Sequence, residues 1–168
     1  MDNSSRGDGR ILVAGIGNIF LGDDGFGVEV VRRLARRQLP EHVTVADFGI
    51  RGVHLAYELL DGGYDGVVLV DALPHGATPG SIRLLEPDLA IPDAGAPGTD
   101  AHGMHPAAVL GLLRRMGADP PPIIVVGCEP ASLEEAIGLS DAVAASVDEA
   151  VRIVTELVDV KGLGIPAP

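Results

Sequence analysis

Cysteine and cationic side chains are scarce in this 168-residue sequence. Its one cysteine, Cys128, can form neither an internal disulfide nor a cysteine-rich zinc site. A single thiol suits a reducing compartment, so we expect a cytoplasmic protein. Lys and Arg number 12 against 24 Asp and Glu, which gives a net charge of -12. Such a chain repels nucleic-acid phosphates and anionic lipid, so neither nucleic acid nor a membrane is an expected partner.

Long hydrophobic runs are also lacking. The first ten residues, MDNSSRGDGR, are polar, and the longest uninterrupted apolar runs after them have the length of a strand. The sequence therefore predicts neither a signal peptide nor a membrane span. Length and a hydrophobic content of 46% indicate one domain. We expect it to cover residues 10–160, between a disordered tail at 1–9 and a flexible tail at 161–168.

Short β-branched runs mark the expected strands. Three of them, at 11–15, 66–72 and 123–127, are apolar without alternation, which is typical of buried parallel strands. A weaker strand is predicted at 43–48. The segment 81–86 alternates enough to be an edge strand, which could be antiparallel.

Amphipathic segments between these runs predict helices. The first has an apolar face and a cationic face, formed by Val28, Val31, Leu34 and Ala35 against Arg32, Arg33, Arg36 and Arg37. Others are predicted at 53–60, at 106–116, and from Ser140 or Asp141 to Val158. This alternation predicts a single three-layer α/β/α domain, doubly wound around a mostly parallel five-stranded sheet.

Ligands collect at the carboxyl ends of the strands in such domains, and this rule selects a short set of polar residues. The set comprises Gly17, Asn18, Asp23 and Asp24 after the first strand, Asp47 after the second, Asp71 after the third, and Cys128 and Glu129 after the last. Two histidines, His102 and His105, lie in the loop before the third helix. The set is acidic, with imidazole available nearby.

Each leading candidate also has a purely structural explanation. Asp23 and Asp24 precede a helix, whose N-terminus favours a carboxylate; one can cap it and leave the other facing the crevice, and Asp23 fits the cap better. Asp71 either caps a turn or is a buried carboxylate that must be paired, hydrogen-bonded or metal-bound. A loop histidine such as His102 is usually solvated. Together, however, Asp24, Asp71 and His102 could bind a divalent transition metal, nickel among them.

Three other interpretations compete with a metal-contacting site. Cys128 beside His102 or His105 would form a nucleophilic pair, although a cysteine that ends a buried strand usually packs as a small hydrophobe. Asp47 can assist catalysis or cap the turn that follows it. The segment GIGNIF imitates a dinucleotide fingerprint, but Phe20 stands where its third glycine would fall, and two carboxylates would repel a pyrophosphate.

The segment ILVAGIGNIFLGDDGFGVEVVRRL resembles the N-terminal signature of the hydrogenase maturation protease family. Four later segments resemble the same family in the same order: VADFGIRGVHLAYEL, GVVLVDAL, HGMHPAAVLGLLRRMG and VVGCEPASLEEAIGLSDAV. The resemblance runs from about Arg10 to Val158. It implies an aspartyl-type endopeptidase of the cytoplasm that removes the C-terminal extension of a nickel-loaded NiFe-hydrogenase large-subunit precursor.

The same resemblance implies roles for particular residues. Asp24, Asp71 and His102 are expected to contact nickel and to be catalytic, with Asp47 as an assisting carboxylate. Nickel is then cargo that the precursor carries, and no organic cofactor is expected. Two rival functions remain: a nickel-binding chaperone or sensor module without protease activity, and a nucleotide-dependent enzyme.

Overall fold

The computed structural model describes residues 9–87 and 106–159. Apart from Gly9, the predicted tails lie outside the described residues, and so do the candidates His102 and His105. None of the helices in the described part of the chain is long and apolar enough to cross a membrane.

Five strands form one mixed sheet in the order β2-β1-β3-β5-β4. Their bounds are Ile11–Ile16 (β1), Val43–Gly49 (β2), Gly66–Ala72 (β3), Ile82–Leu85 (β4) and Ile123–Cys128 (β5). β1 runs parallel to β2 and β3, and β3 runs parallel to β5, whereas β4 is antiparallel to β5. All five predicted strands are confirmed, and the edge strand is antiparallel.

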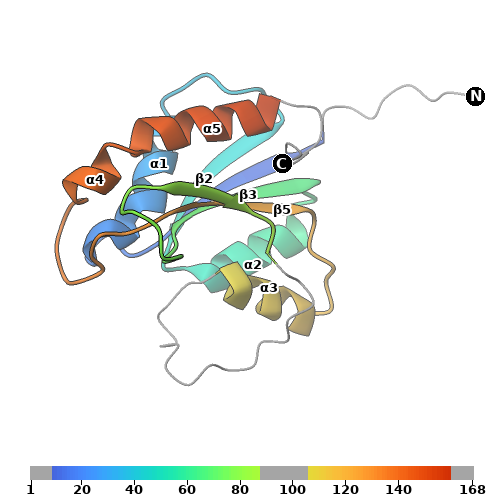
Figure 1. Ribbon diagram of the computed structural model, residues 1–168. Coiled ribbons are helices and arrows are strands. Elements are labelled where there is room, and N and C mark those ends of the chain that lie inside the picture. Colours follow the sequence, from blue (N-terminus) through green and yellow to red (C-terminus); the bar gives the residue numbers. More distant parts are fainter. Residues whose placement is uncertain (1–8, 88–105, 160–168) are drawn as a thin grey trace, which may run out of the picture.

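Helices cover both faces of this sheet. They are a 3-10 turn at Gly22–Gly25 (η1) and α-helices at Phe26–Leu34 (α1), Gly52–Asp61 (α2), Pro106–Arg115 (α3), Asp141–Ala144 (α4) and Val147–Asp159 (α5). Figure 1 shows α1 and α5 on one face and α2 and α3 on the other. The predicted three-layer α/β/α fold is therefore confirmed.

The C-terminal helix, predicted as one, is divided into α4 and α5. The Ser140 side chain caps α4 by accepting a hydrogen bond from the Val143 N–H. The break after α4 contains Ser146, whose hydroxyl donates to the carbonyl of Gly80 in the loop after β3. The same hydroxyl lies 3.2 Å from the carbonyl of Ala142, and a local bond of this kind competes with regular helix geometry. The bond to Gly80 attaches the break to the loop between β3 and β4.

Two apolar cores hold the layers together. Val13, Val68 and Val126 pack with α1 and α5, whereas the alternate strand residues Leu69 and Val125 pack with α2 and α3. Each such side chain stabilises the fold by about 1.5–3 kcal/mol when fully buried. Because both sheet faces are covered, the strands are apolar without alternation, as in the sequence.

The strand order defines a topological switch point. From β1 the chain crosses through α1 to β2 on one side, and from β2 it crosses through α2, on the opposite face, back to β3 on the other side of β1. The crevice for a ligand in a doubly wound sheet lies at this point, outside the carboxyl ends of β1 and β3. The loop after β1 and the end of β3 therefore meet there.

Two glycines let α1 lie against the backbone of the sheet. A Cβ atom on Gly27 would lie 2.0 Å from the carbonyl oxygen of Val70 and 2.5 Å from that of Ile16. A Cβ on Gly15 would lie 2.5 Å from the carbonyl oxygen of Gly27. This close approach fixes the start of α1, and with it η1, above the ends of β1 and β3.

We predict that Gly27→Ala destabilises the protein by about 3 kcal/mol, the upper end of the usual cost of overpacking. Helix propensity alone would give the opposite sign, because Ala is favoured over Gly by about 1 kcal/mol inside a helix. Urea unfolding followed by circular dichroism measures the difference. A variant as stable as the wild type, or more stable, would show that α1 does not need this contact.

Candidate functional site at the carboxyl ends of the strands

Asp24 and Asp71 lie together at the switch point. Asp71, near the end of β3, is only 2% exposed, and Asp24 is half-buried in η1, which contacts β3. The backbone N–H of Asn18 donates to Oδ2 of Asp24 over 2.7 Å, which closes the loop after β1 around this carboxylate. The structure thus brings together two of the three predicted metal-contacting residues.

The electrostatics of this pair resemble those of coupled acids in catalytic sites. Burial raises the pKa of Asp71 well above its usual value, and the negative charge of Asp24 raises it further, against a lowering by the hydrogen bond from the Ala72 backbone. A buried carboxyl beside a second carboxylate favours either a shared proton or a cation between them. The pair is therefore suited to acid–base chemistry or to contact with a metal ion.

Gly17 shapes the turn that places Asp24. Its φ angle is 136°, in the region that favours glycine, and a Cβ there would lie 1.9 Å from the carbonyl oxygen of Asp24. The N–H of Gly17 donates to the carbonyl of Gly49, the last residue of β2, over 2.9 Å. Packing against Asp24 accounts for this glycine of the GIGNIF segment without a bound nucleotide.

Asp23 is not a helix cap, so that interpretation is wrong. The N-cap positions of η1 and α1 make no side-chain hydrogen bond. The Asp23 carboxylate, 1% exposed, instead accepts bonds from the loop after β5: from the N–H groups of Ala131 (2.8 Å), Ser132 (3.1 Å) and Ser140 (2.7 Å), and from the Ser140 hydroxyl (2.9 Å). One buried carboxylate therefore connects the loops that follow β1 and β5.

Asp47 lies near the end of β2, opposite Gly15 of β1. Its Oδ2 is 3.6 Å from Nε of Arg32 on α1, and its side chain is 35% exposed. The Arg51 guanidinium donates to the main-chain carbonyl of Asp47 over 2.8 Å. Asp47 is thus a carboxylate at the carboxyl end of the sheet, and the positive charge of Arg32 lies close to its negative charge.

Cys128 has the properties of a structural cysteine. The side chain is fully buried, and its Sγ donates weakly to the carbonyl of Glu129 over 3.8 Å. Burial raises the pKa of the thiol to about 11, with smaller contributions from the negative charges of Asp23 and Glu129. The thiol is protonated at neutral pH, which argues against a nucleophilic role.

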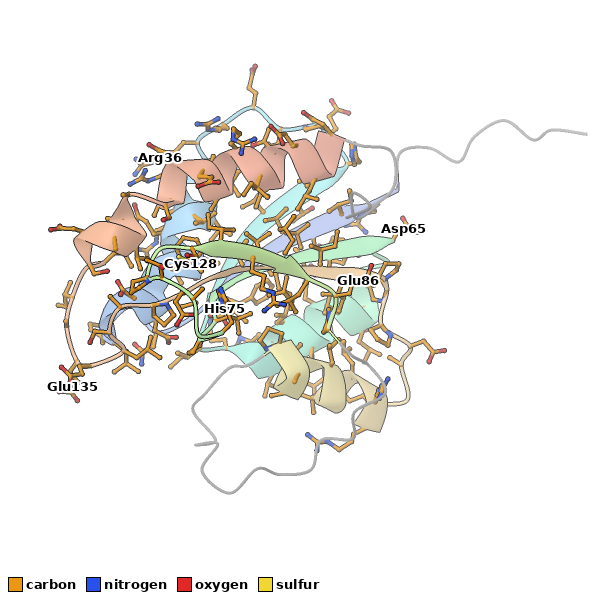
Figure 2. The ribbon with its side chains drawn as sticks, in the orientation of Figure 1. Arg36, Asp65, His75, Glu86, Cys128 and Glu135 are labelled. Carbon is orange, nitrogen blue, oxygen red and sulfur yellow. The ribbon has the colours of Figure 1, made fainter. Side chains whose placement is uncertain are left out.

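A histidine that the sequence reasoning missed lies at the same end of the sheet. The backbone N–H of His75 donates to Oε2 of Glu129 over 2.6 Å. The ring Nδ1 of His75 lies 2.8 Å from the carbonyl oxygen of Leu73 and 3.2 Å from Oε2 of Glu129. Figure 2 shows His75 and Cys128 at the end of the sheet away from Asp65. His75 follows β3 by three residues, so a wider search after each strand would have found it.

Within residues 9–87 and 106–159, no group of three or more His, Cys, Asp or Glu residues is arranged to hold a metal ion. Of the three predicted metal-contacting residues, Asp24 and Asp71 are described, and His102 lies outside these residues. The fold and the site together define a class of protein: a doubly wound α/β domain with a coupled pair of acids at its switch point.

Comparisons with known proteins identify the family within this class. The sequence profile of the hydrogenase maturation proteases matches residues 28–157. The chain is 34% identical over 145 residues to the hydrogenase 2 maturation protease of Escherichia coli K12, with 85% of this chain and 87% of that protein covered. It is 34% identical over 162 residues to the hydrogenase expression/formation protein HupD of Bradyrhizobium diazoefficiens, with 93% and 83% covered. The chain belongs to the hydrogenase maturation protease family, and it is a peptide-bond hydrolase of that family.

Solved structures agree with this assignment. The hydrogenase maturating endopeptidase HybD of Escherichia coli superposes with a TM-score of 0.71 at 32% identity, covering 86% of this chain and 89% of that one. The hydrogenase maturation protease HycI of Thermococcus kodakarensis KOD1 gives a TM-score of 0.73 at 25% identity, covering 92% and 95%. Both the fold class and the predicted family are confirmed.

We predict that Asp23→Asn destabilises the protein by about 1.5–3 kcal/mol at neutral pH, the usual range for hydrogen bonds to a charged group. Burial raises the pKa of Asp23, but the hydrogen bonds from Ser140, Ala131 and Ser132 together hold it below its usual value. The stabilisation is therefore present above about pH 4 and is lost as the pH falls through the lowered pKa.

Urea unfolding at pH 7 and near pH 3 tests this, with the exposed Glu156→Gln as a matched control for charge removal. The control should differ from the wild type by less than about 0.5 kcal/mol. An Asp23→Asn deficit that is equal at both pH values would mean that the ionised carboxylate does not hold the loops.

Asp71→Asn should stabilise the protein at neutral pH, whereas Asp23→Asn destabilises it. Because the folded-state pKa of Asp71 lies above the unfolded value of about 3.9, the folded protein binds more protons than the unfolded chain above about pH 4. Stability from this group is thus full below pH 4 and declines as the pH rises toward the raised pKa. The neutral Asn avoids the decline, so the melting temperature of this variant should exceed that of the wild type at pH 7.5 but not at pH 4. No gain at pH 7.5 would contradict the raised pKa of Asp71.

Proposed function

We propose that this protease removes the C-terminal extension of a nickel-loaded NiFe-hydrogenase large-subunit precursor in the cytoplasm. The observation that carries the proposal is the coupled pair of Asp24 and Asp71 at the switch point of a chain in the hydrogenase maturation protease family. The names of the relatives, a hydrogenase 2 maturation protease and a maturating endopeptidase, support proteolysis during hydrogenase assembly.

In this proposal nickel belongs to the substrate. Asp24 and Asp71 place two carboxylates, one of them buried, at a point where burial and like charge both raise the pKa of Asp71. A divalent ion presented by the precursor supplies a compensating positive charge, and carboxylate oxygens suit such an ion without selecting nickel on affinity alone. His102 is the proposed third contact. The metal-loaded precursor is thereby distinguished from the empty one.

Engagement of the metal also positions the scissile bond. Holding the precursor by its metal converts the attack on a nearby peptide bond into a step within one complex, which accelerates the reaction through proximity. The coupled pair and the candidate Asp47 are all aspartates, so the proposed hydrolysis is aspartyl-type. A site carboxylate accepts a proton from the attacking water, with Asp47 as the assisting candidate.

The first experiment is the intact mass of a large-subunit precursor before and after incubation with this protein, in nickel-loaded and nickel-free forms. We expect a C-terminal peptide to be lost only from the nickel-loaded form. A nickel-binding chaperone or sensor would bind metal and leave the mass of the precursor unchanged, and that result would overturn the protease proposal. A nucleotide-dependent enzyme would instead show a higher melting temperature with NAD or ATP.

The site residues are tested in the same assay. Asp24→Ala, Asp71→Ala and His102→Ala should each lower the cleavage rate by about 100-fold or more, the usual contribution of a positioned acid or base. Asp148→Ala, on the exposed start of α5, is the control and should cleave like the wild type. Circular dichroism confirms that each variant is folded. Full processing by all three site variants would refute these assignments.

A further inference from the structure

Four exposed apolar side chains lie on the two loops that Asp23 connects. Ile19 and Phe20, in the loop after β1, are 37% and 62% exposed, and Leu133 and Ile137, in the loop after β5, are 41% and 85% exposed. Single exposed apolar residues are ordinary, but several on adjoining segments indicate a contact surface. We call these four residues the loop patch.

Backbone hydrogen bonds show that the two halves of the loop patch adjoin. The Ala136 N–H donates to the carbonyl of Phe20 over 3.0 Å, and the Gly22 N–H donates to the carbonyl of Ala136 over 2.9 Å. The Asp23 N–H donates to the carbonyl of Ser132 over 3.1 Å. Phe20 is therefore directly paired with the neighbour of Ile137, and Leu133 follows the next contact along the same loop.

The loop patch is formed before any partner arrives. Its two loops share these backbone bonds as well as the four bonds accepted by the buried Asp23 carboxylate. Little conformational freedom remains to be lost when a partner binds, so burying the apolar atoms contributes more fully to affinity. Such an exposed but rigid apolar surface is suited to docking.

The position of the loop patch connects it to the acid pair. Asp24 directly follows Asp23 in η1, and its carboxylate accepts a bond from Asn18, the neighbour of Ile19. Figure 2 shows Glu135, on the loop after β5, at the same end of the molecule as His75 and Cys128. A protein bound to the loop patch would thus lie beside Asp24.

The charge around the loop patch restricts the partner. Residues 17–24 and 129–138 contain no Lys, Arg or His, and of their five acids Asp23 and Glu129 are buried while Asp24, Glu134 and Glu135 are at least partly exposed. Glu134 and Glu135 are both exposed within the second loop. A second copy of this chain would bring the same acids against these glutamates, whereas a partner with basic residues around an apolar surface would complement them.

We propose that Ile19, Phe20, Leu133 and Ile137 form the docking surface for the precursor protein. The matching precursor surface is apolar with lysine or arginine at its border, and docking there directs the precursor's tail to Asp24 and Asp71. This inference rests on the proposed function and adds the surface through which the protease recognises the folded part of its substrate.

The test is the kinetics of precursor cleavage by the double variant Phe20→Ala/Ile137→Ala. We expect KM to rise by about 10-fold to 100-fold with little change in kcat, because the contact is made equally in the ground state and the transition state. Phe20→Leu should recover most of the affinity lost in Phe20→Ala. Glu134→Lys/Glu135→Lys should also raise KM, and it should weaken the dependence of KM on salt.

Leu60→Ala is the matched control. Leu60 is 40% exposed near the end of α2, which leads into the start of β3, so it lies at the end of the sheet away from the loop patch. The KM of this variant should therefore equal that of the wild type. An unchanged KM in the double variant, or an equal rise in Leu60→Ala, would overturn the docking inference while cleavage by the wild type upholds the proposed function.

A wild-type dimer that the double variant abolishes would overturn the docking inference by assigning the loop patch to a second copy. Failure of the wild type to cleave a loaded precursor would overturn both proposals.

Discussion

The buried carboxylate of Asp23 holds the functional end of this molecule together. It accepts four hydrogen bonds from the loop after β5 while belonging to the loop after β1, so two connections far apart in sequence behave as one unit. An ionised group with so little exposure is stable only with this number of donors. Both the position of Asp24 and the rigidity of the loop patch depend on it.

The neighbouring Asp71 illustrates the opposite electrostatic situation. Asp23 is surrounded by donors and its pKa is lowered, whereas Asp71 is buried beside a like charge and its pKa is raised. One carboxylate thus stabilises the fold, and the other is held in an environment that disfavours its charge. Strain of this second kind is common at functional sites, where stability is lower than packing alone would allow.

Much of the fold could be predicted because the strands and helices are specified locally. Apolar β-branched runs indicated four strands, and alternation indicated the edge strand, all within a residue or two of their ends. The tendency of ligands to collect at strand ends placed Asp24 and Asp71 in a short set of candidates, which the family resemblance then narrowed. The errors concern contacts between distant segments. The role of Asp23, the break at Ser146 and the His75–Glu129 contact each depend on a partner 54 or more residues away.

The sequence by itself determined the α/β alternation, the acidic residues at the carboxyl ends of the strands, and the family, since each follows from local patterns or ordered motifs. Only the tertiary structure decided which adjacent aspartate is buried, that Cys128 is an inert thiol, and that Phe20 and Ile137 share one surface. The physical reason is that desolvation and hydrogen bonding depend on what lies across a loop or strand, and spacing along the chain does not encode that neighbour.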